Sequence, residues 1–338
     1  MLTTRSRFAP LVTSLCLAAA PVFTDVAQAE PTGGDRGSWR TASPAPTKRT
    51  EVAAGALFGK IYVVGGFEKP GLGNVLNLAI TPSLEVYYPS TDTWTTQTPM
   101  PVGLHHVGLG VADGRLYVIG GYRQSGFSVW HAVATVYAYD PVTDTWTERA
   151  PMPTARGALS VTEHEGKLYA IGGYDGKANS AAVEVYDPVT NAWTSCAPLP
   201  TPRDHLATAT VAGKVYAIGG RVNGDYHRNL AVTERYDPAT DRWTRVADLP
   251  TARSGITAAV VGERIYVFGG EGGEGTFNEN EAYDSARDAW QAMAPMPTAR
   301  HGLGSAVVQG RIHVIDGGPT PGGSFSDLHE VFTPFGAR

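Results

Sequence analysis

The chain has 338 residues, of which 42% are hydrophobic and 17% are charged. Its 32 acidic residues outnumber its 27 Lys and Arg residues, giving a formal net charge of −5. This balance disfavours a nucleic-acid partner or an anionic membrane surface. The length and hydrophobic content suffice for one large domain.

The N-terminal segment has the pattern of a secretory signal peptide. Arg5 and Arg7 precede an apolar stretch, residues 11–23, and the small residues Ala27 and Ala29 follow it. We expect cleavage after Ala29, a flexible lead over residues 30–37 and a secreted or periplasmic location.

A retained membrane anchor is the alternative for this segment. Pro10, Pro21 and Asp25 interrupt its apolar stretch, which is too short for a stable span, so we expect no membrane span. Cleavage would remove Cys16 and leave only Cys196, so an intramolecular disulfide is excluded in the mature chain. We expect Cys196 to be a packed small residue rather than a nucleophile.

From residue 38 onward, one unit of about 50 residues occurs six times. Each unit has an apolar run, a turn, a second apolar run ending in a Gly pair, and, in five units, a Tyr seven residues before a Trp. The Gly pairs are Gly65-Gly66, Gly120-Gly121, Gly172-Gly173, Gly219-Gly220, Gly269-Gly270 and, less regularly, Gly317-Gly318. The aromatic pairs are Tyr87 and Trp94, Tyr139 and Trp146, Tyr186 and Trp193, Tyr236 and Trp243, and Tyr283 and Trp290.

Each unit is expected to form four short strands, because turn signals separate its apolar runs and helical periodicity is almost absent. One such sheet cannot bury both faces, and radial stacking supplies neighbours on each side. Six Gly pairs at one place in a strand repeat favour a packing role over a phosphate-binding loop.

The Gly pairs and the Tyr–Trp spacing resemble the kelch repeat over essentially the whole chain after residue 38. The resemblance implies an all-β fold, a six-bladed kelch β-propeller with four-stranded antiparallel blades. We expect a single propeller over residues 38–338.

The first and last units are each incomplete. Trp39 has no Tyr upstream, and the segment Leu328 to Phe332 occupies a Tyr strand without a later Trp. We infer that Trp39 supplies the outer strand of the sixth blade and closes the ring, which removes exposed sheet edges.

Variation in length is confined to one loop in each unit. The Arg position lies 17 residues before the second Gly in the first five units, and the Tyr lies 17 residues before the next Arg position. Only the loop between the Gly pair and the Tyr varies. It joins the second and third strands at the end where the Arg positions lie, so we expect the binding site at this loop face.

Five arginines are candidate ligand-binding residues at this face, and Leu104 stands at the sixth position. They are Arg49, Arg156, Arg203, Arg253 and Arg300. In kelch propellers with known ligands the equivalent arginines often line the binding mouth, and the resemblance implies this here. Converging guanidinium groups suit carboxylates. The alternative is a structural role, with bonds to carbonyls of the neighbouring blade or ion pairs with Glu51, Asp204 and Asp316.

Histidine and tryptophan candidates gather near the second unit. His105 and Trp130 are expected to contact ligand, with His205 and His301 at nearby positions in other blades. Trp130 is off the repeat register and suits a stacking platform; the alternative is that it covers the edge of its own blade.

A metal site at His105 or His106 is not expected. Adjacent residues on a strand point to opposite faces, so at most one of the pair would face the channel. Kelch enzymes that use iron or copper carry dedicated ligand sets without a residue-by-residue match here. We expect no cofactor and no metal.

The catalytic candidates are Asp316, Glu51 and His106. In the sixth unit Asp316-Gly317 aligns with the Gly pairs of the other units, so Asp316 stands where they have their first Gly. The alternative for Asp316 is a salt bridge to Arg49 or Arg300. The sequence contains no nucleophile elbow, catalytic triad or phosphate-binding loop.

The function expected from these observations is a binding module that recognises a protein segment or an anionic glycan at the loop face, and is a monomer. The alternative is a sugar mutarotase or epimerase acting on a sialic-acid-like substrate, because some secreted bacterial kelch propellers resemble this chain and perform that chemistry. Sugar-ring opening requires little more than a proton donor and acceptor.

Overall fold

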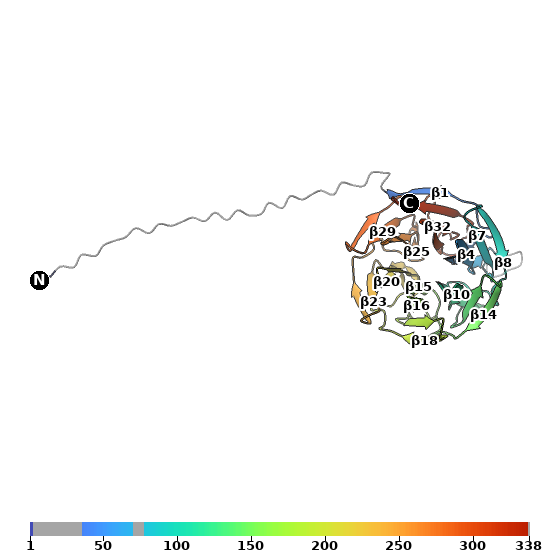
Figure 1. Ribbon diagram of the computed structural model, residues 1–338, viewed down its shortest axis with the longest axis horizontal. Helices are drawn as coiled ribbons and strands as arrows, with labels where there is room; N and C mark the ends of the chain where they lie inside the picture. Colours follow the sequence, from blue (N-terminus) through green and yellow to red (C-terminus); the bar gives the residue numbers. More distant parts are fainter. Residues whose placement is uncertain (3–35, 70–77, 337–338) are drawn as a thin grey trace. The chain divides into compact units, whose positions relative to one another are not determined.

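The computed structural model describes residues 1–2, 36–69 and 78–336. One compact unit spans Thr32–Arg338, and its described part holds 33 strands and no α-helix (Figure 1). The predicted signal peptide, apart from Met1 and Leu2, lies outside the described residues, as does most of the predicted lead. No helix among the described residues is long and apolar enough to cross a membrane.

The described residues form six four-stranded antiparallel sheets, which confirms the all-β architecture expected from the repeats. The sheets, in chain order, are β3 (Ala53–Leu57), β4 (Lys60–Val64), β7 (Leu84–Tyr88) and β8 (Thr93–Gln97); β9 (Gly108–Ala112), β10 (Arg115–Ile119), β13 (Val136–Asp140) and β14 (Thr145–Arg149); β15 (Ser160–His164), β16 (Lys167–Ile171), β17 (Val183–Asp187) and β18 (Ala192–Ser195); β19 (Ala207–Val211), β20 (Lys214–Ile218), β23 (Thr233–Asp237) and β24 (Arg242–Arg245); β25 (Thr257–Val261), β26 (Arg264–Phe268), β29 (Asn280–Asp284) and β30 (Ala289–Ala292); and β31 (Gly304–Val308), β32 (Arg311–Ile315), β33 (His329–Thr333) and β1 (Ser38–Thr41).

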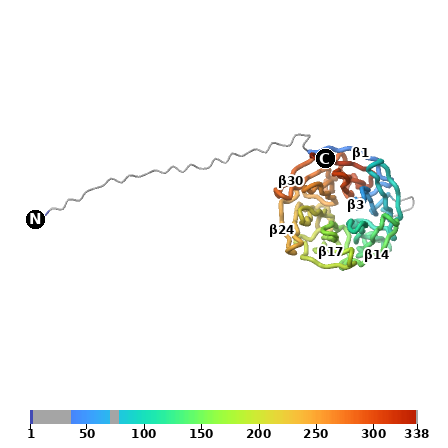
Figure 2. The backbone as a smooth tube through the Cα atoms, viewed as in Figure 1, coloured from blue at the N-terminus to red at the C-terminus, as the bar shows by residue number. Residues whose placement is uncertain are grey.

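The sheets are arranged radially as blades around a common axis, with the first strand of each innermost (Figure 2). Hydrophobic clusters join adjacent blades. One cluster combines Tyr62 and Val64 of the first blade with Leu116 and Val118 of the second. Each blade therefore buries its faces against its neighbours, as a stacked repeat requires.

The sixth sheet is completed by residues from the other end of the unit. β1 pairs antiparallel with β33, and Trp39 stands opposite Phe332, with ring centroids 5.0 Å apart. Trp39 thus occupies the outer-strand position that the last repeat lacks.

The repeat tryptophans bond each blade to the one before it. Each indole Nε1–H donates to a backbone carbonyl across the blade boundary at 2.8–3.0 Å. The pairs are Trp39 and Ala294, Trp94 and Ser43, Trp146 and Thr98, Trp193 and Ala150, Trp243 and Ala197, and Trp290 and Ala247. Because an indole buried in part needs a partner for its N–H, this bond fixes the position of each Trp in the repeat.

The Gly pairs lie where neighbouring backbones approach closely. Gly173 has φ +103°, and a Cβ there would lie 2.7 Å from the carbonyl oxygen of Gly157. A side chain is excluded by both conformation and space. This supports the packing role expected of the Gly pairs.

The loops between second and third strands fold back as short strands at one end of the ring. These are β5 (Phe67–Glu68) and β6 (Ala79–Ile80) with β2 (Arg49–Thr50), β11 (Tyr122–Ser125) with β12 (Ser128–Ala132), β21 (Arg221–Val222) with β22 (Asp225–Asn229), and β27 (Glu271–Gly272) with β28 (Gly275–Thr276). Single bridges such as His105 to Tyr122 and Asp204 to Arg221 tie the loops to the turns that carry the Arg positions. Loops and turns therefore meet at one face, here called the loop face.

Candidate functional site at the channel mouth

Six residues with left-handed backbone form a closed belt around the channel at the loop face. Each lies two residues after an Arg position, with φ between 50° and 70°. The belt residues are Glu51, His106, Ala158, His205, Gly255 and Gly302. In five of them the backbone carbonyl oxygen accepts a hydrogen bond from the backbone N–H of the next belt residue. The N–H of Val52 completes the ring by donating to Gly302 O at 3.3 Å. The bonds of the ring are 2.9–3.3 Å long.

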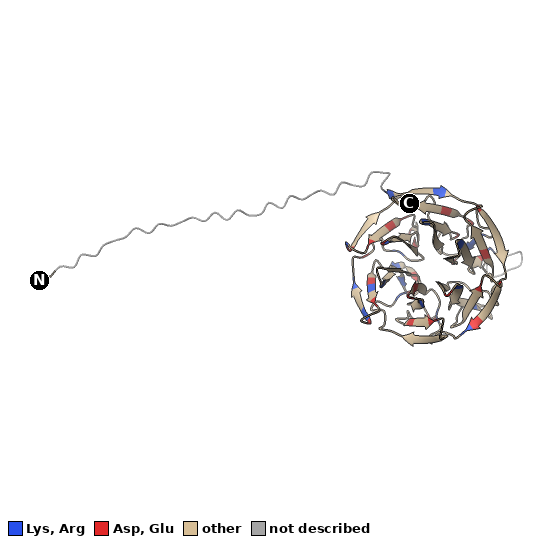
Figure 3. Ribbon diagram, viewed as in Figure 1, with Lys and Arg blue, Asp and Glu red and all other residues tan. Residues whose placement is uncertain are grey.

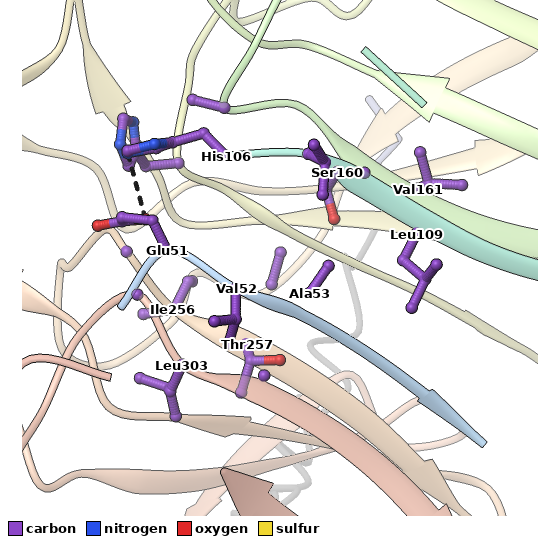
Figure 4. Close-up of a pocket in the computed structure, with 18 of the residues that line it drawn as sticks. Glu51, Val52, Ala53, His106, Leu109, Ser160, Val161, Ile256, Thr257 and Leu303 are labelled. Carbon is purple, nitrogen blue, oxygen red and sulfur yellow. Dashed lines mark ion pairs between the residues drawn. The ribbon is translucent and has the colours of Figure 1, made fainter. Parts of the chain in front are cut away.

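The belt places functional side chains at the mouth of a small cavity. The cavity has a volume of about 160 Å³ and is lined by the belt and by the innermost strands (Figure 4). Ligand pockets usually measure about 300–1,000 Å³, so this space is too small to enclose a sugar. Recognition of anything larger must take place at the mouth.

Five side chains, here called the mouth cluster, gather around the carboxylate of Glu51: Glu51, His106, His205, Glu271 and His301. The first three of them line the cavity. His106 Nε2 lies 3.2 Å from Glu51 Oε2, and His301 Nε2 lies 3.5 Å from Glu51 Oε1. His301 Nε2 is also 3.6 Å from Glu271 Oε2. Gly302 makes room for this arrangement, because a Cβ there would lie 2.7 Å from the Glu51 carboxyl carbon.

Arg221 links the two sides of the mouth cluster. It donates to Glu271 Oε1 at 2.6 Å and to His205 Nε2 at 2.7 Å. Since Arg221 only donates, His205 Nε2 accepts, and its Nδ1–H donates to Asp204 Oδ1 at 2.6 Å. Burial alone would raise the pKa of Asp204, but the bond from His205 and the charge of Arg221 lower it.

His105 and His106 contact each other rather than diverging. The expected alternation fails because His106 has φ +53°, and residues alternate between faces only along extended backbone. Burial lowers the pKa of His105 to about 3 and that of His106 well below its usual value, so both are neutral. His106 alone of the pair lines the cavity, which agrees with the expectation that at most one of them faces the channel.

Trp130 lies on β12 beside the mouth cluster. Its ring centroid is 5.3 Å from that of His106, 5.1 Å from His105 and 5.4 Å from Tyr122. Trp130 is nevertheless 49% exposed. Its ring packs on residues of its own blade and also presents a face to solvent, so its contact with a ligand stays a prediction.

Models of known protein families were matched to this chain to find its family. A family model described as the KLHDC2/KLHL20/DRC7 Kelch-repeats domain matches residues 105–248 and 200–333, and one described as the Kelch motif matches residues 48–101. The chain belongs to the kelch-repeat family. This agrees with the resemblance seen in the Gly pairs and Tyr–Trp spacing.

Relatives match this kelch chain over part of their length. Kelch-like protein terF of Aspergillus terreus is 35% identical over 127 residues, which are 37% of this chain and 27% of the relative. Human Kelch-like protein 28 is 35% identical over 121 residues, 35% of this chain and 20% of the relative. The chain thus spans about a quarter of the length of these relatives.

The solved structure of YjhT shares the fold. The TM-score is 0.71 with 17% sequence identity, and the match covers 86% of this chain and 96% of that chain. At this identity the likeness shows the fold alone.

The five kelch arginines do not line the mouth, which corrects the prediction that they contact a ligand. All five are fully buried, and each pairs with a Glu on the third strand of its own blade. The pairs are Arg49 and Glu85, Arg156 and Glu184, Arg203 and Glu234, Arg253 and Glu281, and Arg300 and Glu330. Arg203 also donates to the carbonyls of Thr201, Ala217 and Gly219. The arginines therefore bond segments of their own blade to each other instead of presenting charge to a ligand.

The position of Asp316 argues against its predicted catalytic role. It is fully buried, and its Oδ2 lies 3.3 Å from Arg49 Nε, as the salt-bridge alternative expected. Burial raises the pKa of Asp316 to about 8 in spite of Arg49, whose guanidinium already pairs with Glu85. Asp316 does not line the cavity at the mouth.

Sequence reasoning missed Glu271 and Arg221. Both directly follow a Gly pair, at Gly269-Gly270 and Gly219-Gly220, and Tyr122 follows Gly120-Gly121 in the same way. The first residue of each variable loop has a fixed place in the repeat. A comparison of that position across the units would have nominated these residues.

Proposed function

We propose that this chain is a kelch binding module that recognises a protein segment at the loop face, with Trp130 as an anchor. The observation that carries the proposal is that Trp130 is half exposed while its ring rests on buried aromatic groups beside the mouth. Half-exposed aromatic side chains held on a rigid base are typical interface anchors.

The hairpin that carries Trp130 has further features of a docking surface. Phe127, near its tip, is 96% exposed. The base is fixed to the next blade, because Tyr122 Oη donates to Tyr174 O at 2.9 Å. An exposed apolar tip on a fixed base suits contact with a protein.

The charges of the loop face favour a protein segment over an anionic glycan. The arginines expected to bind anions are buried and paired, and Glu51 places a carboxylate in the lining of the cavity. Figure 3 shows acidic and basic residues distributed over the blades rather than gathered on one side. We place the module outside the cytoplasm on the strength of the signal pattern in residues 1–29.

Selection of peptides with matched variants tests this proposal. Random peptides displayed on phage are selected on the full chain, and their affinities are measured for the wild type, Trp130→Ala and Phe58→Ala. Phe58 is the control, because it is an exposed aromatic in the β3–β4 turn, at the opposite end of the blade.

We expect Trp130→Ala to weaken binding by about 2 kcal/mol or more, roughly thirtyfold, as for an interface hot spot, and Phe58→Ala to change it little. Peptides that bind Trp130→Ala as tightly as the wild type would contradict the proposal. If no peptide binds but an arrayed glycan does so through Trp130, the glycan replaces the protein segment as ligand.

The sugar-enzyme alternative is second and is supported by one contact, the 3.2 Å approach of His106 Nε2 to Glu51 Oε2. With Asp316 buried, these two groups are its remaining acid–base candidates. The test is the rate of anomer exchange of a sugar acid, measured by NMR, which Glu51→Gln should abolish if the alternative holds.

A further inference from the structure

We propose that the mouth cluster binds a divalent first-row transition-metal ion, with Glu51, Glu271 and His301 as ligands and His106 as the fourth. This goes beyond the proposed recognition of a protein segment and rests on different residues. It also departs from the expectation of no metal, which considered the pair His105-His106 and known ligand sets and did not include Glu271.

Three of the ligand atoms have separations that suit a metal site. One atom each from Glu51, Glu271 and His301 lies within 4.8 Å of the others, while His106 belongs to a second such group with Glu51 and His205. The measured approaches are 3.2, 3.5 and 3.6 Å. Bonds of about 2.0–2.2 Å to one ion in tetrahedral geometry place ligand atoms about 3.3–3.5 Å apart, which is close to these separations. His106 faces the other oxygen of Glu51, so a shift of side chains is needed for it to join the same ion.

Hydrogen bonds on the far side of each imidazole leave the facing nitrogen free to coordinate. His301 Nδ1 lies 3.0 Å from the carbonyl oxygen of Gly318, which only accepts, so Nδ1 carries a proton and the neutral ring offers a lone pair at Nε2. This lone pair lies between the carboxylates of Glu51 and Glu271. A backbone carbonyl behind the ring is the usual outer partner of a metal-ligating His.

His106 reaches the same state through its neighbour. His105 Nε2–H donates to Val129 O at 2.8 Å, so His105 Nδ1 accepts the proton of His106 Nδ1 at 2.5 Å. His106 Nε2 is then an unprotonated nitrogen, and it faces the carboxylate of Glu51. The residue His106 is 93% buried. Two acceptors at 3.2 Å without a proton between them repel each other, and a cation removes this repulsion.

His205 is excluded from the ligand set although it lies close by. Its Nε2 already accepts from Arg221 Nη2 at 2.7 Å, and Arg221 also neutralises part of the charge of Glu271 through Oε1. Glu271 keeps Oε2 for the ion, where Gly322 N also donates at 3.0 Å. Two imidazole nitrogens with two carboxylates favour an ion such as Zn²⁺ over Ca²⁺ or Mg²⁺, which prefer oxygen ligands throughout.

The test is titration of the full chain with Zn²⁺ by calorimetry after removal of metal with a chelator. We expect one ion per chain. Glu51→Gln and His301→Ala should weaken binding at least a hundredfold. His227→Ala is the control, since it removes an exposed imidazole of the β21–β22 hairpin outside the mouth cluster.

Glu51→Gln separates loss of ligand from loss of fold. Its amide can donate to His106 Nε2 or His301 Nε2, so without metal its unfolding temperature should equal or exceed that of the wild type. The proposal is overturned if the wild type binds none of Zn²⁺, Mn²⁺, Co²⁺ and Ni²⁺, or if a folded Glu51→Gln binds as tightly as the wild type. Trp130→Ala should retain Zn²⁺, so failure of the peptide proposal is distinguishable from failure of this one.

Discussion

At the scale of single residues, the buried arginines are each paired and hydrogen-bonded inside the blades. Removing a guanidinium from water is costly, and the cost is offset only where its donors and charge are all matched. Arg203 meets this condition, because Glu234 and three backbone carbonyls accept from it. Burial lowers the pKa of Arg203, and the charge of Glu234 opposes that effect.

We predict that Arg203→Ala lowers the free energy of unfolding by about 3–5 kcal/mol, because it leaves the carboxylate of Glu234 buried without its partner. Arg245→Ala is the matched control in the same blade, since Arg245 forms an exposed pair with Asp248 and should leave the unfolding midpoint nearly unchanged. Denaturant unfolding followed by Trp fluorescence measures both. Equal effects of the two variants would contradict the structural role of Arg203.

The sequence contained a signal that these arginines are paired. In five units the Arg position accompanies a Thr two residues earlier and a Glu two residues before the aromatic residue of the third strand, as in Thr201, Arg203 and Glu234. The second unit has Val102, Leu104 and Tyr137 at these places, so all three polar groups disappear together. The Arg positions taken alone favoured a role in ligand binding. The joint occurrence of Thr, Arg and Glu would instead have predicted a buried Arg–Glu ion pair.

At the scale of elements, backbone conformation decides where side chains go. The strands, the Gly pairs and the loop face were predictable, because apolar runs, turns and constant spacing depend on local sequence. The belt was not, since left-handed backbone at Glu51 and His106 arises from hydrogen bonds between blades rather than from residue type. The mouth cluster, which depends on the belt, was therefore predicted only in part.

We predict that Gly173→Ala destabilises the fold by at least about 2 kcal/mol more than Gly166→Ala. Both residues have positive φ, but a Cβ at Gly173 would lie 2.7 Å from Gly157 O, whereas a Cβ at Gly166 meets nothing within 4 Å. The pair separates steric contact from backbone strain. Denaturant unfolding of the two variants is the measurement, and equal losses would show that φ alone matters.

At the scale of the whole molecule, the two ends of the ring carry different loops. Turns such as Phe58–Gly59 and Glu165–Gly166 are short and keep one length, whereas the opposite end carries the hairpins, Trp130 and the mouth cluster. Pairing of β1 with β33 and the tryptophan bonds between blades support this division, because they fix the blades that carry the loops. A ligand is therefore expected to contact one end of the propeller, the loop face.

Hydrogen exchange of backbone amides, with and without a selected peptide, tests this most directly. We predict slower exchange in residues 122–132 and in neighbouring loops of the loop face, with the turns at Phe58–Gly59 and Glu165–Gly166 unchanged. Protection at those turns, with none in residues 122–132, would contradict the assignment of the loop face as the binding surface.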